Sequence, residues 1–330
     1  MWLGMDHCLF CIPLKNGIMK IYDIIATKLS IAMHQLNTIK SILLLIFLGF
    51  IWGSGYTLAK FAMTNGVSPL GYAFWQSLGP ALLLTFFCLI TKKTSLLQPT
   101  YWPYFLICGL IGITIPNTNM YFIASHIPAG LLAVLVNTVP LLVYPLALLA
   151  KQEKLDSWRF FALLLGMTGI LLIVGINSSG FYSSWTLLAM LTPLAFAICS
   201  IYIGAKQPTE IDSLQAASGM LLAASLLLIP LVLSQHAFYP LSGPLTLVKQ
   251  VVILEIILSS LGYLLFFILI RMAGPVFYSL TGGIVALTGL FWGYLIFNER
   301  PTAIQSMAVV LVICSLFLLS WRQSRQYQGI

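Results

Sequence analysis

The sequence predicts an all-α polytopic membrane protein with ten transmembrane helices, arranged as two inverted five-helix repeats. Three observations lead to this prediction: a composition suited to lipid, ten apolar segments of spanning length, and a second half that repeats the first. Of the 330 residues, 60% are hydrophobic and 7% are charged, and the mean hydropathy is +0.99. Soluble domains carry about 25% charged residues. Lipid must therefore surround most of this chain.

The net charge of +8 does not indicate a nucleic-acid partner. The 16 Lys and Arg residues stand singly or in pairs between apolar runs, as they do in the loops of membrane proteins. Four of the six cysteines lie inside apolar runs. Cys8 and Cys11 form a lone C-x-x-C without the second ligand pair of a structural zinc site, so we expect no metal and no other cofactor.

Residues 1–39 form a leader that stands apart from the spans. From Ile21, apolar residues recur at helical spacing, with polar residues on the opposite face. This pattern predicts an amphipathic helix lying on the cytoplasmic surface of the membrane. Translation starting at Met19 or Met33 instead of Met1 is an open alternative.

Ten apolar runs follow, each close to the about 20 residues that cross the hydrocarbon layer. Turn-forming or charged residues separate them, for example Asn65-Gly66, Ala273-Gly274 and the segment "NERPT" at 298–302. The predicted spans are 40–63, 68–91, 101–123, 128–150, 157–176, 184–205, 212–233, 248–271, 274–297 and 302–321.

The basic residues near the span ends predict the orientation. With the N-terminus inside, ten Lys and Arg residues near the spans fall on the cytoplasmic side and three on the outer side. Cytoplasmic loops carry the excess of Lys and Arg. Both termini, including the tail at 323–330, are therefore predicted to be cytoplasmic, with the chain in the cell inner membrane.

The repeat is visible in short phrases. Residues 54–60 read "SGYTLAK" and residues 200–206 read "SIYIGAK", an offset of 146. The same offset aligns Glu153 of "KQEKL" with Glu299 of "FNERP". The repeats are predicted at 40–177 and 178–322. Because each contains an odd number of spans, the second must cross the membrane in the opposite sense, which is typical of secondary transporters.

Several segments resemble the EamA family of the drug/metabolite transporter superfamily. They are "IFLGFIWGSGYTLAKFAM", "NTNMYFIASHIPAGLLAVLVNTVPLLVYPLALLAKQEKLD" and "FNERPTAIQSMAVVLVICSLFLL", and the resemblance covers about residues 40–321. It implies this fold and the transport of a metabolite, in a family whose substrates include amino acids, nucleosides and amines. Members often carry Arg in the second helix, where this chain has Trp75 and Gln76.

The candidate substrate-binding residues are aromatic and polar side chains inside the spans, many of them paired on one helix face. Aromatic walls with a few polar groups are typical of such sites, although membrane helices use the same residues for packing. Asn137 is the strongest candidate, because an amide in hydrocarbon needs a hydrogen-bond partner. The candidates are Trp52, Tyr56, Gln76, Asn117, Tyr121, Asn137, Tyr202, Tyr263, Thr281 and Trp292.

Glu255 is the one acidic residue predicted inside a span and not at its first or last position. One interpretation is that its side chain reaches along the helix toward Lys249 at the membrane surface. The other is that the carboxyl group takes up a proton and couples proton movement to substrate movement.

The sequence thus predicts a secondary transporter, not an enzyme, that moves a small metabolite by alternating access, with export as the expected direction. The metabolite would be amino-acid-like, an amine or nucleoside-like. The alternatives are a membrane subunit without transport activity and an intramembrane lipid-modifying enzyme. Expected partners are the substrate, the bilayer and a proton as candidate coupling ion, with the chain a monomer or homodimer. The sequence leaves the substrate, the direction and the coupling ion open.

Overall fold

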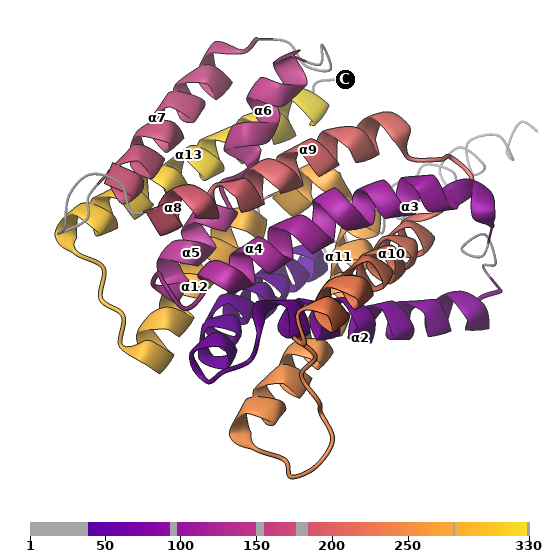
Figure 1. Ribbon diagram of the computed structural model, residues 1–330. Helices are drawn as coiled ribbons and strands as arrows, with labels where there is room; N and C mark the ends of the chain where they lie inside the picture. Colours follow the sequence, from indigo (N-terminus) through magenta and orange to yellow (C-terminus); the bar gives the residue numbers. More distant parts are fainter. Residues whose placement is uncertain (1–38, 93–97, 150–154, 176–183, 280, 329–330) are drawn as a thin grey trace, which may run out of the picture. The chain divides into compact units, whose positions relative to one another are not determined.

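The computed structural model describes residues 39–92, 98–149, 155–175, 184–279 and 281–328, and every regular element within these ranges is helical (Figure 1). The chain divides into two compact units, residues 1–44 and 45–330. The packing considered below belongs to the second unit. The predicted amphipathic leader lies outside the described residues, apart from Ile39.

The first helix covers Ile39–Thr64. The other elements, in chain order, are α2 (Pro69–Ile90), η2 (Pro99–Tyr101), α3 (Trp102–Gly109), η3 (Leu110–Thr114), α4 (Ile115–Ile123), α5 (Ala129–Val136), α6 (Val139–Leu149), α7 (Ser157–Gly175), α8 (Ser184–Ala189), α9 (Leu191–Lys206), α10 (Ser213–Ser234), α11 (Leu247–Ser279), α12 (Thr281–Phe297) and α13 (Ala303–Gln328).

The described residues contain seven helical segments long and apolar enough to cross a membrane. They are Ile39–Thr64, Pro69–Ile90, Pro99–Ile123, Ala129–Leu146, Ser184–Ile203, Leu214–Ser234 and Leu247–Phe266. Three shorter apolar helices, Ser157–Leu172, Thr281–Phe297 and Ala303–Leu318, occupy the remaining predicted positions. An all-helical, multi-pass membrane architecture is therefore confirmed, in the order that the sequence predicts.

One predicted boundary is wrong. The sequence places a break at Ala273-Gly274, whereas α11 continues through this pair to Ser279 and α12 begins at Thr281. In hydrocarbon no water is present to bond an exposed backbone, so a helix continues through Gly and Pro that would end it in a soluble protein.

Two spans are interrupted in their middle. In the third span, η3 is a π-helical turn that ends just before Ile115 and Pro116. Proline lacks an N–H and clashes with the carbonyl four residues earlier, and a widened turn relieves this. In the fourth span, α5 ends at Val136 with Asn137 as its C-cap, and α6 starts at Val139. These interruptions position the polar residues described below.

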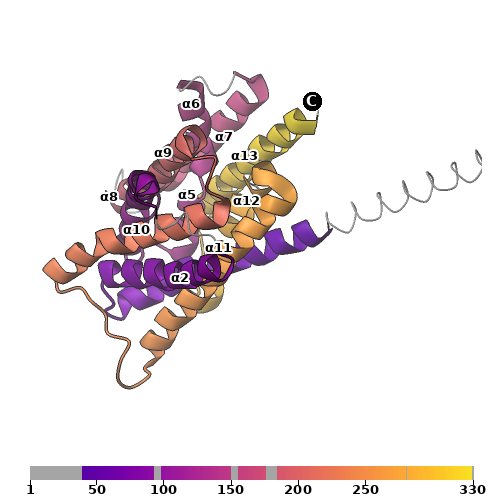
Figure 2. The same cartoon turned by 90° about the vertical axis from the view of Figure 1, so that its right-hand side faces the viewer.

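Helices at equivalent positions in the two halves pack against each other in antiparallel pairs. α7 and α13 lie side by side in both views (Figures 1 and 2). Ser315 Oγ donates to the Ala162 carbonyl at 2.5 Å, and a Cβ built at Gly169 would lie 2.7 Å from the Ala308 carbonyl oxygen. Adding 146 to Ala162 gives Ala308, and subtracting 146 from Ser315 gives Gly169. Exchanging the two halves therefore converts one contact into the other.

The pair α2 and α10 follows the same arrangement. The hydroxyls of Thr85 and Ser218 are 2.8 Å apart, and at the opposite end Ser68 Oγ donates to the Ala237 carbonyl at 2.6 Å. Residues late in one helix therefore meet residues early in the other. Small and hydroxyl side chains let membrane helices approach closely, and both helix pairs have such side chains at their contacts.

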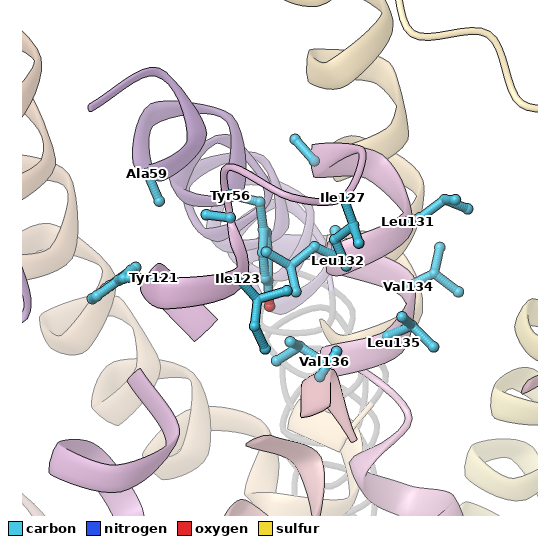
Figure 3. Packing of buried hydrophobic residues seen from close by; sticks show 14 of the residues in the cluster. Tyr56, Ala59, Tyr121, Ile123, Ile127, Leu131, Leu132, Val134, Leu135 and Val136 are labelled. Carbon is cyan, nitrogen blue, oxygen red and sulfur yellow. The ribbon is translucent and has the colours of Figure 1, made fainter. Parts of the chain in front are cut away.

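The third such pair, α5 and α12, lies against the main core. All eight residues of α5 are buried. Around it is a cluster of buried apolar side chains that includes Tyr56, Ile123 and Leu132 (Figure 3). Large apolar side chains elsewhere point outward, among them Leu171 at 61% and Phe86 at 57% exposed. In a lipid solvent such a surface is stable, because leaving it exposed carries no hydrophobic penalty.

We predict that Gly169→Ala destabilises the protein by about 1–3 kcal/mol, the usual cost of overpacking. The added methyl group would press on the Ala308 carbonyl oxygen and on Val312 Cγ2 at 2.8 Å. Gly283→Ala is the matched control, because a Cβ there meets no atom within 4 Å and helix propensity favours Ala over Gly. Thermal unfolding in detergent measures both. Equal melting temperatures for the two variants would contradict the described packing of α7 on α13.

Candidate functional site

A chain of hydrogen bonds crosses the interior of the bundle and joins three helices. Asn117 Nδ2 donates to Gln76 Oε1 at 3.0 Å, and Gln76 Nε2 donates to Ser259 Oγ at 3.3 Å. Ser259 Oγ in turn donates to Glu255 Oε1 at 2.9 Å. We call these four residues, from α4, α2 and α11, the polar chain. It brings together three residues that the sequence singles out: Gln76, Asn117 and Glu255.

Local structure explains why these side chains meet. Asn117 follows the π-helical turn and Pro116, which set the rotation of α4. Glu255 and Ser259 are four residues apart and share one face of α11. All four side chains are buried, with Gln76 the most exposed at 9%. Polar groups at such depth need partners, and a linked chain supplies them.

Glu255 lies inside the bundle. The residue is 7% exposed, and Oε2 has no hydrogen-bond partner among the described residues. Lys249 donates instead to the Ser242 carbonyl in the loop before α11. The structure therefore does not pair Glu255 with Lys249, and the proton-coupling interpretation stays a prediction.

Tyrosine residues flank the polar chain on its helices. Tyr72 and Tyr121 meet edge to face with ring centroids 4.7 Å apart. Together with Tyr263, each lies four residues from a member of the polar chain on the same helix. Trp52 of the first helix lies edge-on to Tyr263 at 6.4 Å. Three of the predicted aromatic residues therefore belong to this group, and Tyr72 joins them.

A second polar pair lies where the fourth span is interrupted. Asn137 Nδ2 donates to Tyr56 Oη at 3.1 Å and to the Ala133 carbonyl at 2.8 Å. A Cβ built at Gly282 would lie 3.6 Å from the Asn137 carbonyl oxygen, so the interruption faces the start of α12. Next to Gly282, Thr281 is 2% exposed and its hydroxyl has no partner within the part of the chain that is described.

Tyr202 and Trp292 lie in other surroundings. Tyr202 stacks on Tyr104 at 6.0 Å, beside a small cluster that contains Cys108 and Cys199. Trp292 Nε1 donates to the Phe50 carbonyl at 3.3 Å. Neither contact involves the polar chain or the Asn137 pair. A substrate role for these two residues stays a prediction.

Sequence reasoning did not select Ser259 or Tyr72, although helical spacing contains a signal for both. Ser259 lies four residues after Glu255 and Tyr72 lies four residues before Gln76, so each shares a helix face with a selected residue. It also did not select Asn119, which donates to the Leu188 carbonyl and to Thr192 Oγ1, both at 2.9 Å. Across the described ranges, no three His, Cys, Asp or Glu residues gather as a metal site.

A separate contact joins the two halves at one end of the bundle. Glu299, which follows α12, accepts a hydrogen bond from Lys60 Nζ at 2.6 Å. Its two carboxylate oxygens also accept from the backbone N–H groups of Ala129 and Gly130, at 3.0 and 3.2 Å, at the start of α5. We call this contact the latch. A carboxylate at a helix N-terminus is stabilised by the free N–H groups and the helix dipole.

A duplicated helical bundle with a buried polar site is typical of membrane transporters. The model of the EamA-like transporter family matches residues 39–175 and again residues 183–321. The chain belongs to the EamA-like transporter family, which confirms the resemblance and its membership of a family of transporters, not of enzymes. Two matches within one chain also support the duplication.

Curated relatives are similar along most of their length. The uncharacterized transporter YvbV of Bacillus subtilis is 25% identical over 302 residues, covering 89% of this chain and 96% of the relative. The uncharacterized inner membrane transporter YedA of Escherichia coli K12 is 28% identical over 287 residues, covering 83% and 80%. One crystal structure aligns with a TM-score of 0.57 and 18% identity over 85% of this chain and 97% of that one. This last similarity concerns the fold alone.

We predict that Lys60 and Glu299 are energetically coupled. Lys60→Met and Glu299→Gln should each lower the free energy of unfolding, and the double variant should lose less than the sum by about 1–3 kcal/mol. Arg300→Gln is the control, since Arg300 is exposed and faces the Tyr294 ring. Its effect should add to that of Lys60→Met. Denaturation in detergent micelles measures the cycle, and an additive Lys60–Glu299 pair would contradict the latch.

Proposed function

We propose that the chain is a secondary transporter of the inner membrane that moves a small metabolite by alternating access, in the direction of export. The observation that carries the proposal is the exchange symmetry of the contacts between the halves. Equivalent helices pack antiparallel, and in α7 and α13 an offset of 146 relates the Ala162–Ser315 contact to the Gly169–Ala308 contact. Two equivalent halves that cross the membrane in opposite senses can rock about an axis at the membrane midplane.

The proposed substrate site comprises the polar chain, the surrounding aromatic rings and the Asn137 pair. The site draws on the first helix, α2, α4 and α5 from one half and on α11 and α12 from the other. A solute bound between the halves makes different contacts in the two conformations, because the halves move relative to each other. A ligand shifts a conformational equilibrium only through such a difference in affinity.

The proposed role of the latch is to hold one side closed. Lys60 and the start of α5 belong to the first half, and Glu299 belongs to the second. Opening this side would separate an ion pair and two capping hydrogen bonds. Glu299 aligns with Glu153 at the offset of 146, and Glu153 lies outside the described residues.

Glu255 is the proposed coupling residue. An unpaired ionised carboxylate is unfavourable in an apolar interior and is stabilised once water reaches it. The carboxyl group would therefore hold a proton in a closed state and release it when the site opens to water. Its protein neighbours with titratable groups are Tyr72 from α2, Tyr121 from α4 and Tyr263 from α11.

The proposed orientation places both termini in the cytoplasm of the cell, as the distribution of basic residues suggests. Reporter fusions after Lys93, Arg159 and Arg325 should then report a cytoplasmic location, and a fusion after Asn65 should report the outside. Reversed signals at two of these four positions would overturn the orientation, because a ten-helix path fixes all four sides together.

The transport activity itself is tested with purified protein in proteoliposomes, by counterflow of labelled amino acids, nucleosides and amines. We predict flux of one of these classes that responds to an imposed pH gradient. Glu255→Gln should abolish that response, because a neutral amide cannot exchange a proton. Asn137→Ala should reduce flux more than it reduces folded yield.

Glu210→Gln is the matched control for Glu255→Gln, because Glu210 is exposed in the connection between α9 and α10. Its flux should follow the pH gradient as that of the parent does. If the flux of the Glu255→Gln protein also follows the pH gradient, Glu255 is not the coupling residue. Absence of flux for every solute class would favour a membrane subunit without transport activity.

A further inference from the structure

The carboxylate of Glu255 has a compensating partner on only one of its two oxygens. Ser259 donates to Oε1 at 2.9 Å, while Oε2 is buried without a hydrogen bond from any described residue. The residue is 7% exposed. An ionised carboxylate at such depth is destabilised by several kcal/mol or more unless a positive charge accompanies it.

The basic side chains whose contacts the structure describes are directed to other groups. Lys60 pairs with Glu299, and Lys249 donates to the Ser242 carbonyl. Arg159 lies over the Tyr144 ring, and Arg300 lies near the ring of Tyr294. The position in α2 that reaches Glu255 through Ser259 is Gln76, which is neutral. The polar chain therefore carries one negative charge when Glu255 is ionised, and its own residues do not balance it.

Aromatic residues lie close to the polar chain along the same helices. Tyr72, Tyr121 and Tyr263 each lie four residues from a member of the polar chain on the same helix, and Trp52 packs edge-on to Tyr263. The faces of tyrosine and tryptophan rings attract cations, and clustered rings of this kind recognise ammonium groups. An apolar organic cation would satisfy both the charge of Glu255 and these rings.

The first helix passes close to the carboxylate at a glycine. A Cβ built at Gly55 would lie 3.4 Å from Oε1 and 3.7 Å from Oε2 of Glu255. The carboxylate therefore faces a stretch of helix backbone without a side chain. Any larger residue at this position would extend toward the oxygens.

We infer that this site binds an organic monocation, an amine or ammonium group on a small apolar body, whose charge neutralises Glu255. The inference rests on the proposed function and names its substrate class. A metal cation fits poorly, because hard cations take six or more oxygen ligands and the polar chain offers one carboxylate with amides and a hydroxyl. An amino acid fits less well than an amine, because the polar chain contains no basic group to pair with a second carboxylate.

The test is equilibrium binding to the purified full chain at a fixed pH of about 7.5, where amines are fully charged. The probes are pairs of equal shape and different charge: choline with 3,3-dimethyl-1-butanol, and phenethylamine with 2-phenylethanol. At least one cation should bind at least tenfold more tightly than its neutral counterpart, because a charge-assisted contact is lost with the charge.

Three variants test whether cation binding depends on the carboxylate itself and not on the stability of the fold. Glu255→Gln should weaken cation binding at least tenfold and leave its melting temperature in detergent near that of the parent, whereas the exposed Glu210→Gln should bind as the parent does. Gly55→Val should also weaken cation binding by placing a side chain against the carboxylate. Equal binding of charged and neutral partners, or cation binding that survives in Glu255→Gln, would overturn the inference.

Failure of the cation-binding inference can be told apart from failure of the transport proposal. If counterflow detects transport of a nucleoside or an amino acid while no cation of the panel binds, the chain is a transporter and the inferred substrate class is wrong. If a cation binds through Glu255 and no solute crosses the membrane, the inferred site stands and the transport proposal fails.

Discussion

The close antiparallel contact between equivalent helices is the constraint on which the arrangement of this protein depends. In lipid, apolar side chains gain little by leaving the solvent, so helices associate where their surfaces fit and where hydroxyl groups find carbonyl partners. Gly169 lets α13 approach α7, and Ser315 bonds the Ala162 carbonyl from the other side. The same fit holds α2 against α10 through Thr85 and Ser218. These contacts fix how the halves face each other and therefore which side chains meet between them.

The polar chain depends on hydrogen bonding between helices and not on close packing. Each of its members would be unfavourable in hydrocarbon alone, and each is tolerated because a neighbour on another helix completes its hydrogen bonds. Gln76 uses its amide as acceptor toward Asn117 and as donor toward Ser259. A single side chain of α2 thereby connects α4 with α11 through hydrogen bonds.

The sequence was sufficient for an all-helical, multi-pass architecture because the signals involved are local or are repeated. Hydropathy locates the apolar helices, although not every break between them, and an offset of 146 relates the halves. The sequence was insufficient for the hydrogen bonds within the site, because these depend on how each helix is rotated about its axis. Nothing around Gln76 indicates that it meets Asn117 and Ser259. Likewise, Glu299 is followed by Arg300, yet it pairs with Lys60, 239 residues away. The misplaced end of α11 has another cause, since Gly and Pro do not end helices reliably within lipid.

The symmetry of the α7–α13 contact also bears on how such a gene is able to change. Ala162 and Gly169 lie seven residues apart on α7, and their partners Ser315 and Ala308 lie seven residues apart on α13. A residue inserted between Ala162 and Gly169 would rotate one end of α7 by about 100° relative to the other, since a helix has about 3.6 residues per turn. Ala162 and Gly169 would then no longer both face α13. Individual side chains in the two copies can diverge widely, but a change in the length of one helix disrupts its contacts with the paired helix. Insertions and deletions are therefore expected to accumulate in the connections between helices, and the length of each helix is constrained by its partner in the other half.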